Sequence, residues 1–138
     1  MSTQHTDSRL KALSGWFFLH FAVDIAFAVP LMFFPETFLS FLGWEIVDPV
    51  ASRIVSAALF GIGIESLLGM KSPAEGYVGL LNLKIIWSVA VLFGLLLSMI
   101  QNSTNSVPFL WVLVAIFAAF NVLWVYWRMR IGRLIAQG

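Results

Sequence analysis

Four long stretches of the 138-residue chain are almost entirely apolar, and short polar stretches separate them. The apolar stretches are roughly residues 13–34, 51–70, 77–100 and 107–128. Each reaches the length of about 20 residues that an α-helix needs to cross the hydrocarbon core of a bilayer. The pattern therefore predicts four membrane-spanning helices. Because the connections are short, neighbouring helices are predicted to run antiparallel.

The polar stretches between the spans carry signals that begin helices. Asp48 is followed by Pro49, which combines a preferred N-cap residue with a proline at the first helical position. Residues 36–45 (ETFLSFLGWE) predict a short helix that lies in the membrane interface. The predicted fold class is all-α: an antiparallel bundle of four transmembrane helices with this short interfacial helix, forming a single domain over residues 1–138.

The composition agrees with a membrane protein. The chain is 60% hydrophobic and 11% charged, with a mean hydropathy of +0.92, whereas soluble domains are about 45–50% apolar and about 25% charged. It contains no cysteine, which excludes disulfides, thiolate metal sites and a cysteine nucleophile. The net charge of +1, with no basic stripe beyond the flanks of the spans, disfavours a nucleic-acid partner. Membrane lipid is the expected surrounding.

The basic residues predict how the chain lies in the membrane. Those that flank one side of the predicted bundle are Arg9, Lys11, Lys71, Arg128, Arg130 and Arg133. On the opposite side, only Arg53 lies near a span. Because Lys and Arg accumulate in cytoplasmic flanks, both termini are predicted to be cytoplasmic. Aromatic residues near the predicted span ends are expected to form interfacial belts; these are Trp16, Trp44, Trp111, Trp124, Tyr126 and Trp127.

Each predicted span carries a polar residue at a similar depth. We measure depth from the span ends on the side of the membrane where both termini are predicted to lie, called here the terminal side. At 1.5 Å of rise per residue, His20, Lys84 and Asn121 lie about 10 Å from that side, and Glu65 lies about 8 Å from it. Asp24 lies about 16 Å deep, one turn beyond His20 and on the same helical face. Such residues are costly in lipid. We therefore expect them to point into the bundle and meet there, with Tyr77, Leu81, Lys84 and Ser88 sharing the inward face of the third span.

Glu65 and Lys84 are predicted to pair, because they lie at similar depth on adjacent helices. Glu65 belongs to a stripe at a spacing of four residues with Arg53, Ala57 and Gly61, which we expect to face the bundle. This pair is interpreted either as a purely structural contact or as one part of a site.

Asp24 and His20 are predicted to bind a proton or a ligand. Asn121 is interpreted either as a further residue of this site or as one that joins helices by a hydrogen bond. Candidate pocket aromatics are Phe17, Phe21 and Trp87. Most of the polar groups lie toward the terminal side. This asymmetry predicts a pocket that opens on that side, toward the cytoplasm.

Residues 33–69 carry a further pattern: a proline that closes the first span, a Leu-Gly turn, an arginine and a glycine-rich second span. The positions are Pro35, Leu42, Gly43, Arg53, Gly61, Gly63 and Gly69. In these features the chain resembles small four-span membrane proteins of the DoxX-like kind, over about a quarter of its length. Some members of that group are membrane partners of oxidoreductases. The resemblance implies the four-span fold; because many members of the group have no assigned activity, it assigns neither an activity nor a functional residue.

Three functions remain open at this stage. Motifs of hydrolases, kinases and metalloenzymes are absent from the sequence, so we expect no catalytic residue and no metal site, and the sequence names no cofactor. The first function is to move or bind protons, ions or a small polar solute, as a homo-oligomer. The second is to serve as a structural or accessory subunit of another membrane protein. The third is to bind a lipid, quinone or pigment.

Overall fold

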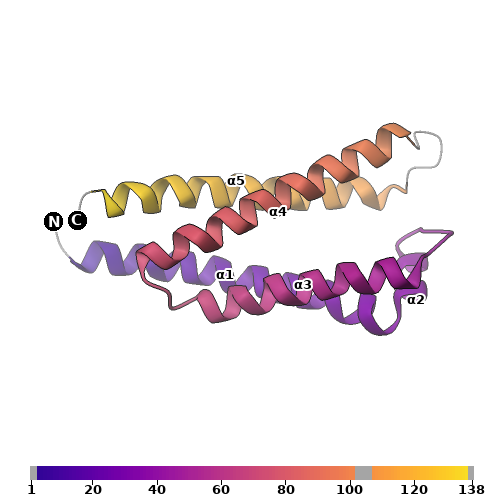
Figure 1. Cartoon of the computed structure of the whole chain (residues 1–138), viewed down its shortest axis with the longest axis horizontal. Coiled ribbons are helices and arrows are strands. Elements are labelled where there is room, and N and C mark those ends of the chain that lie inside the picture. The colour runs from indigo at the N-terminus through magenta and orange to yellow at the C-terminus, as the bar shows by residue number, and fades with distance from the viewer. Residues whose placement is uncertain (1–2, 102–106, 137–138) are drawn as a thin grey trace.

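A computed structural model describes residues 3–101 and 107–136, with side chains described from Leu10 onward. This part of the chain contains five helices (Figure 1): α1 (Thr3–Phe33), α2 (Pro35–Phe41), α3 (Pro49–Gly69), α4 (Ala74–Gln101) and α5 (Phe109–Ile135). The four longer helices are long and apolar enough to cross a membrane. The predicted all-α membrane bundle is therefore confirmed, and so is the presence of a short helix between the first two spans.

One predicted helix boundary is wrong, and one helix is longer than the span predicted for it. The short helix, predicted over residues 36–45, ends at Phe41, because Gly43 follows with a φ of 103° in the left-handed region, outside helical geometry. The helix that carries the fourth predicted span, α5, continues past residue 128 to Ile135. Ile131 is buried there, four residues after the buried Trp127, so the inward face of α5 continues for about one more turn.

The four long helices form two closely packed pairs. α1 packs along α3, and α4 packs along α5, while contacts between the two pairs are sparse. In Figure 1, α4 starts beside the α1–α3 pair and crosses obliquely to run beside α5. The N-terminal end of α1 and the C-terminal end of α5 lie at the same end of the bundle, which we call the terminal end. The short helix α2 lies at the opposite end. In Figure 1, α4 diverges from α3 toward the end at which α2 lies.

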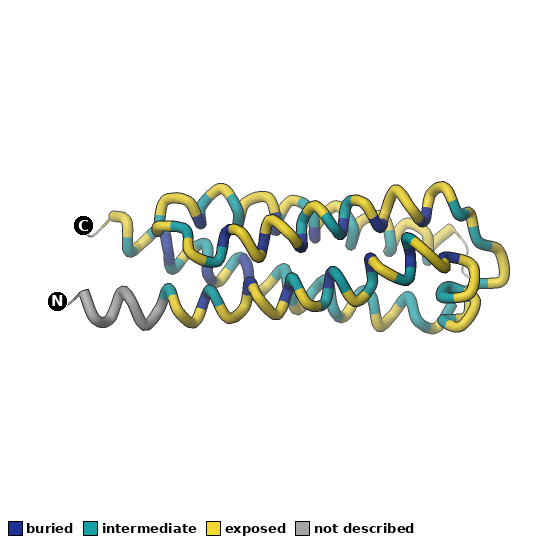
Figure 2. The backbone as a smooth tube through the Cα atoms, turned by 90° about the horizontal axis from the view of Figure 1, so that it is seen from below, coloured by how far each residue is buried: buried dark blue, intermediate teal, exposed yellow. Residues whose placement is uncertain are grey.

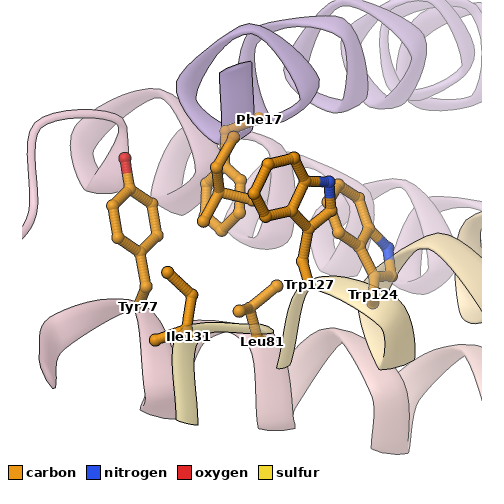
Figure 3. Close-up of a cluster of buried hydrophobic side chains, with 7 residues drawn as sticks. Phe17, Tyr77, Leu81, Trp124, Trp127 and Ile131 are labelled. Atoms are coloured by element: carbon orange, nitrogen blue, oxygen red, sulfur yellow. The ribbon is translucent and has the colours of Figure 1, made fainter. Parts of the chain in front are cut away.

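A cluster of large side chains joins the two pairs near the terminal end (Figure 3). This core cluster consists of the buried residues Leu13, Phe17, Tyr77, Leu81, Trp124, Trp127 and Ile131. The ring of Phe17 from α1 packs edge-on against Tyr77 of α4 and Trp124 of α5, with centroid separations of 5.2 and 5.6 Å. The Tyr77 hydroxyl donates to the carbonyl of Met70 at 2.5 Å. The bundle is therefore closed and well packed at this end.

The outer surface of the bundle is apolar. Exposed positions follow the outward sides of the helices along most of their length (Figure 2). They include large side chains such as Ile86, Phe93 and Val122, each more than two-thirds exposed. A surface of this kind is stable in contact with lipid chains, which agrees with a bundle whose outer faces meet the membrane.

The N-terminus of α3 is capped as the sequence predicts. The Asp48 carboxylate accepts from the backbone N–H of Val50 at 2.9 Å and of Ala51 at 3.1 Å, and Pro49 occupies the first turn. Replacing Asp48 by alanine is expected to lower the free energy of unfolding by about 1 kcal/mol, because two N–H groups lose their acceptor. Asp48→Asn should leave it nearly unchanged, since asparagine caps equally well. Unfolding in mixed detergent micelles measures both; equal losses would contradict this account of the cap.

Candidate functional site: a polar cluster at the end of an apolar cavity

All four long helices contribute to one buried polar cluster. We define the polar cluster by its residues: His20 and Asp24 from α1, Ser66 from α3, Lys84 and Ser88 from α4, and Asn121 from α5. It lies next to the core cluster, because the Lys84 ammonium sits over the rings of Phe17 and Trp124, 4.9 and 5.3 Å from their centroids. The predicted meeting of the polar residues of the four spans is confirmed, apart from the residue that α3 supplies.

Lys84 is the central cation of the polar cluster and is only 3% exposed. Its ammonium donates to the Ser66 hydroxyl at 2.5 Å and lies 3.3 Å from Nδ1 of His20. Ser66 in turn donates to the carbonyl of Ile62 one turn earlier, at 2.7 Å. These oxygen and nitrogen contacts, together with the two aromatic faces, surround the ammonium. Its position is thus fixed by three helices other than its own.

His20 connects Lys84 to Asp24. Its Nδ1 lies 2.9 Å from Oδ2 of Asp24 and also contacts the Lys84 ammonium. A carboxylate only accepts and an ammonium only donates, so this nitrogen can hydrogen-bond with one of them at a time, depending on where its proton sits. The ring is held by edge-on contacts with Phe120 and Trp124, at centroid distances of 4.9 and 5.2 Å. The orientation of the imidazole is therefore set by packing.

Asp24 is buried without an aligned hydrogen-bond donor. Its side chain is 9% exposed, and among the described residues no aligned donor reaches Oδ2, although His20 lies close to it. Its neighbour on α3 is Gly63, where an added Cβ would lie 2.9 Å from Cβ of Asp24. The glycine thus allows α1 and α3 to approach closely at the level of this carboxylate.

Asn121 and Ser88 complete the polar cluster between α5 and α4. The Asn121 amide donates to the Ser88 hydroxyl at 2.8 Å and to the carbonyl of Ile85 at 3.3 Å. Ser88 donates to the carbonyl of Lys84 at 2.8 Å. This confirms that Asn121 hydrogen-bonds across helices. Ser88 is buried on the face shared with Tyr77, Leu81 and Lys84, as the helical spacing predicts.

The predicted pairing of Glu65 with Lys84 is wrong. Glu65 is exposed on the outward side of α3, and within the described residues no ion pair joins it to Lys84. The other members of its stripe, Arg53, Ala57 and Gly61, are exposed as well. Arg53 donates to the carbonyl of Met32 at the end of α1 instead.

The inward face of α3 is a different set of residues, namely Ser52, Ser56, Leu59, Gly63 and Ser66. Their spacing alternates between four and three residues, which stays on one side of a helix with 3.6 residues per turn. A constant spacing of four, as in the Glu65 stripe, drifts around the helix by about 40° per step. Ser66 was therefore missed in the sequence, although this alternating spacing of small residues was the signal that points to it.

A cavity of about 510 Å³ extends from the polar cluster between the two helix pairs. His20, Asp24, Lys84 and Ser88 line its inner end, and its walls are almost entirely apolar. On α1 the lining runs from His20 to Leu31, a rise of about 16 Å. The far end is lined by α2 and the loop after it, with Trp44 packed edge-on against Phe109 at 6.3 Å.

The direction of this cavity corrects the prediction of a pocket that opens at the terminal end. Trp124 lines the cavity and also belongs to the core cluster, which fills the bundle on that side. The cavity instead extends toward α2. The physical reason is that the buried aromatic side chains, such as Phe17, Tyr77 and Trp127, lie near the terminal end and fill the bundle there, whereas α4 diverges from α3 away from it.

The predicted aromatic residues lie in three different environments. Trp87 lines the cavity, Phe17 is buried in the core cluster beside it, and Phe21 packs on Phe18 outside the cavity lining. Of the expected interfacial belt, Trp124 and Trp127 are buried inside the bundle, because their positions continue the inward face of α5. Trp16, Trp111 and Tyr126 are exposed, as residues at an interface must be.

Neither metal chemistry nor a known relative identifies the site. Within residues 10–101 and 107–136, whose side chains the structure describes, no group of three or more His, Cys, Asp or Glu side chains could hold a metal ion. Comparisons of the chain with protein-family models, with curated proteins and with solved structures find no match. The resemblance to DoxX-like proteins therefore stays a prediction, and the function has to be argued from the polar cluster and the cavity.

Proposed function

We propose that this four-span membrane protein binds a lipid-like amphiphile in the cavity between its helix pairs. The apolar part of the molecule lies along the walls, and its polar head reaches the polar cluster. The observation that carries this proposal is the combination of about 510 Å³ of apolar space with a charged, hydrogen-bonding inner end. Ligand sites are commonly apolar cavities of about 300–1,000 Å³ with a few well-placed polar groups.

The same geometry favours binding over transport through one subunit. A path for protons, ions or polar solutes has to continue beyond the polar cluster, yet the tightly packed core cluster lies there. The walls on the other side are apolar and offer few groups to replace the hydration of an ion. An amphiphile that enters from one leaflet and leaves into the same leaflet needs neither a path beyond the polar cluster nor polar groups along the walls.

The orientation of the chain suggests where the amphiphile enters. With both termini in the cytoplasm, as the basic residues Lys71, Arg128 and Arg133 favour, the end of the cavity near α2 faces the outer leaflet. The mouth is lined by apolar residues such as Leu42 and Ile46, and Phe41 and Ile46 are among the most exposed side chains. They suit contact with lipid at the interface, so an amphiphile can enter from that leaflet without crossing water.

Filling the cavity is expected to abolish binding. Val91 lines the cavity, whereas Val89, two residues earlier on α4, is half exposed on the outer surface. Native mass spectrometry of gently extracted protein should show a lipid-like amphiphile bound to the wild type and to Val89→Trp. The same mass should be missing from Val91→Trp, because the indole occupies the space.

Two results would contradict the proposal. One is equal retention of the compound in both tryptophan variants, which would place it on the outer surface. The other is a wild-type protein that carries no apolar compound and takes up none when long-chain alcohols or lipids are added. A second polypeptide that copurifies with all three proteins would favour the accessory-subunit interpretation.

A further inference from the structure

The Asp24 carboxylate in the polar cluster has no aligned hydrogen-bond donor. Asp24 lines the cavity, and its side chain is about nine-tenths buried. Its Oδ2 lies 2.9 Å from Nδ1 of His20, but no donor among the described residues is aligned with it. A buried carboxylate oxygen without a donor is destabilising, so such groups are rare unless something else binds them. Asp24 lines the inner end of the apolar cavity, so the head of a bound amphiphile that extends there would meet its carboxylate.

The other members of the polar cluster already have partners. The Lys84 ammonium is occupied by Ser66, His20 and two aromatic faces. Ser88 and Asn121 hydrogen-bond to each other and to backbone carbonyls. The group that the polar cluster lacks is therefore a hydrogen-bond donor placed next to Asp24.

The charges around Asp24 limit what that donor can be. Asp24 and Lys84 carry opposite formal charges and contact the same nitrogen of His20, so the polar cluster is balanced without a charged ligand. An ammonium head would be repelled by Lys84, and a carboxylate head would be repelled by Asp24 and could not donate to it. A neutral head with an O–H group meets both requirements.

We infer that the cavity selects neutral amphiphiles that carry a hydroxyl group, an alcohol or a phenol, and that this hydroxyl donates to the Asp24 carboxylate. The inference rests on the proposed function, because it assigns the head group of the molecule that the cavity binds. Asp24 acts here as a binding residue, and the apolar walls hold the remainder of the molecule.

Competition among compounds with one chain length tests this head-group preference. Purified protein is incubated at neutral pH with equal concentrations of dodecanol, methyl dodecanoate, dodecanoate and dodecylamine, and the occupied fractions are read by native mass spectrometry. We expect dodecanol to exceed methyl dodecanoate by about tenfold or more, since a hydrogen bond to a charged acceptor corresponds to at least that factor. Dodecanoate and dodecylamine should bind more weakly than dodecanol.

Two isosteric variants assign the preference to one carboxylate. In Asp24→Asn the preference of dodecanol over methyl dodecanoate should fall to near unity, because an amide is uncharged and can donate to the ester carbonyl. In Asp48→Asn the preference should stay at the wild-type value. Asp48 also lines the cavity, but at its other end, and asparagine preserves the N-cap of α3.

The outcomes separate this inference from the proposed function. If the wild type binds none of the four compounds, the cavity does not hold amphiphiles and the proposed function fails. If it binds all four equally, and Val91→Trp binds none, the cavity holds amphiphiles but the head-group inference is overturned. Preference for dodecanoate or dodecylamine overturns it as well. The wild-type competition decides the matter even if Asp24→Asn does not fold.

Discussion

Replacing Lys84 by methionine is expected to lower the free energy of unfolding by about 3–5 kcal/mol, the largest effect of any single change to the polar cluster. Methionine has a similar length and can fill the space between Phe17 and Trp124. It removes the only cation buried beside Asp24 in the described part of the chain, and it leaves that carboxylate uncompensated. Removing one partner of a buried, balanced set of charges is costly because the other charge stays behind. Unfolding in mixed micelles with increasing dodecyl sulfate measures the loss.

Double variants identify which carboxylate Lys84 balances. In the Lys84→Met background, Asp24→Asn should recover most of the lost stability, because it removes the uncompensated charge. Glu65→Gln should recover none and should be silent alone, since Glu65 is exposed on the outward side of α3. Recovery by Glu65→Gln instead of Asp24→Asn would restore the ion pair that the sequence predicts and contradict the geometry described above.

Replacing Gly63 by leucine is expected to lower the free energy of unfolding by about 3 kcal/mol, at the upper end of the range for overpacking. A Cβ at Gly63 would lie 2.9 Å from Cβ of Asp24, and the rest of the leucine side chain would extend farther into α1. The two helices must then separate. Asp24 would move away from His20, so binding of dodecanol should be lost together with stability.

Gly61 provides the matched control on the same helix. A Cβ there meets no atom within 4 Å, and the position is exposed. Gly61→Leu should therefore leave both the unfolding transition and dodecanol binding unchanged, and any gain in helix propensity is common to the two variants. Equal destabilisation by the two substitutions would show that α3 presents a different face to α1.

The number and approximate position of the spans could be predicted from the sequence, because the hydropathy of residues 51–70 or 77–100 depends on composition alone. The same uniform hydropathy makes the inward face of α3 hard to predict, since apolar residues surround the helix on every side. Only the small residues, with Gly63 and Ser66 among them, distinguish the face that packs on α1. Glu65 misled the prediction because its charge suggested an inward position, whereas it lies near the end of the span and points outward.

The His20, Asp24 and Lys84 part of the site was predictable for a physical reason: charged groups in the middle of a span have few options besides the bundle interior. The cavity was not predictable. Its existence depends on how far the α1–α3 pair diverges from the α4–α5 pair, and this divergence reflects the summed volumes of side chains from all four helices. Trp124 and Phe17 hold the pairs together at one end. Nothing in the sequence indicates whether the pairs also touch farther along the bundle, where the cavity lies.

The most direct test of the central claim locates a bound amphiphile inside the molecule. Dodecanol that carries a diazirine at its terminal carbon is bound to the wild-type protein, and the complex is irradiated. The labelled residues are then identified by peptide mass spectrometry. With the hydroxyl at Asp24, the label should fall on residues at the far end of the cavity, such as Trp44, Val47 and Phe109. Labelling confined to lipid-facing residues such as Ile86 and Phe93 would contradict the account.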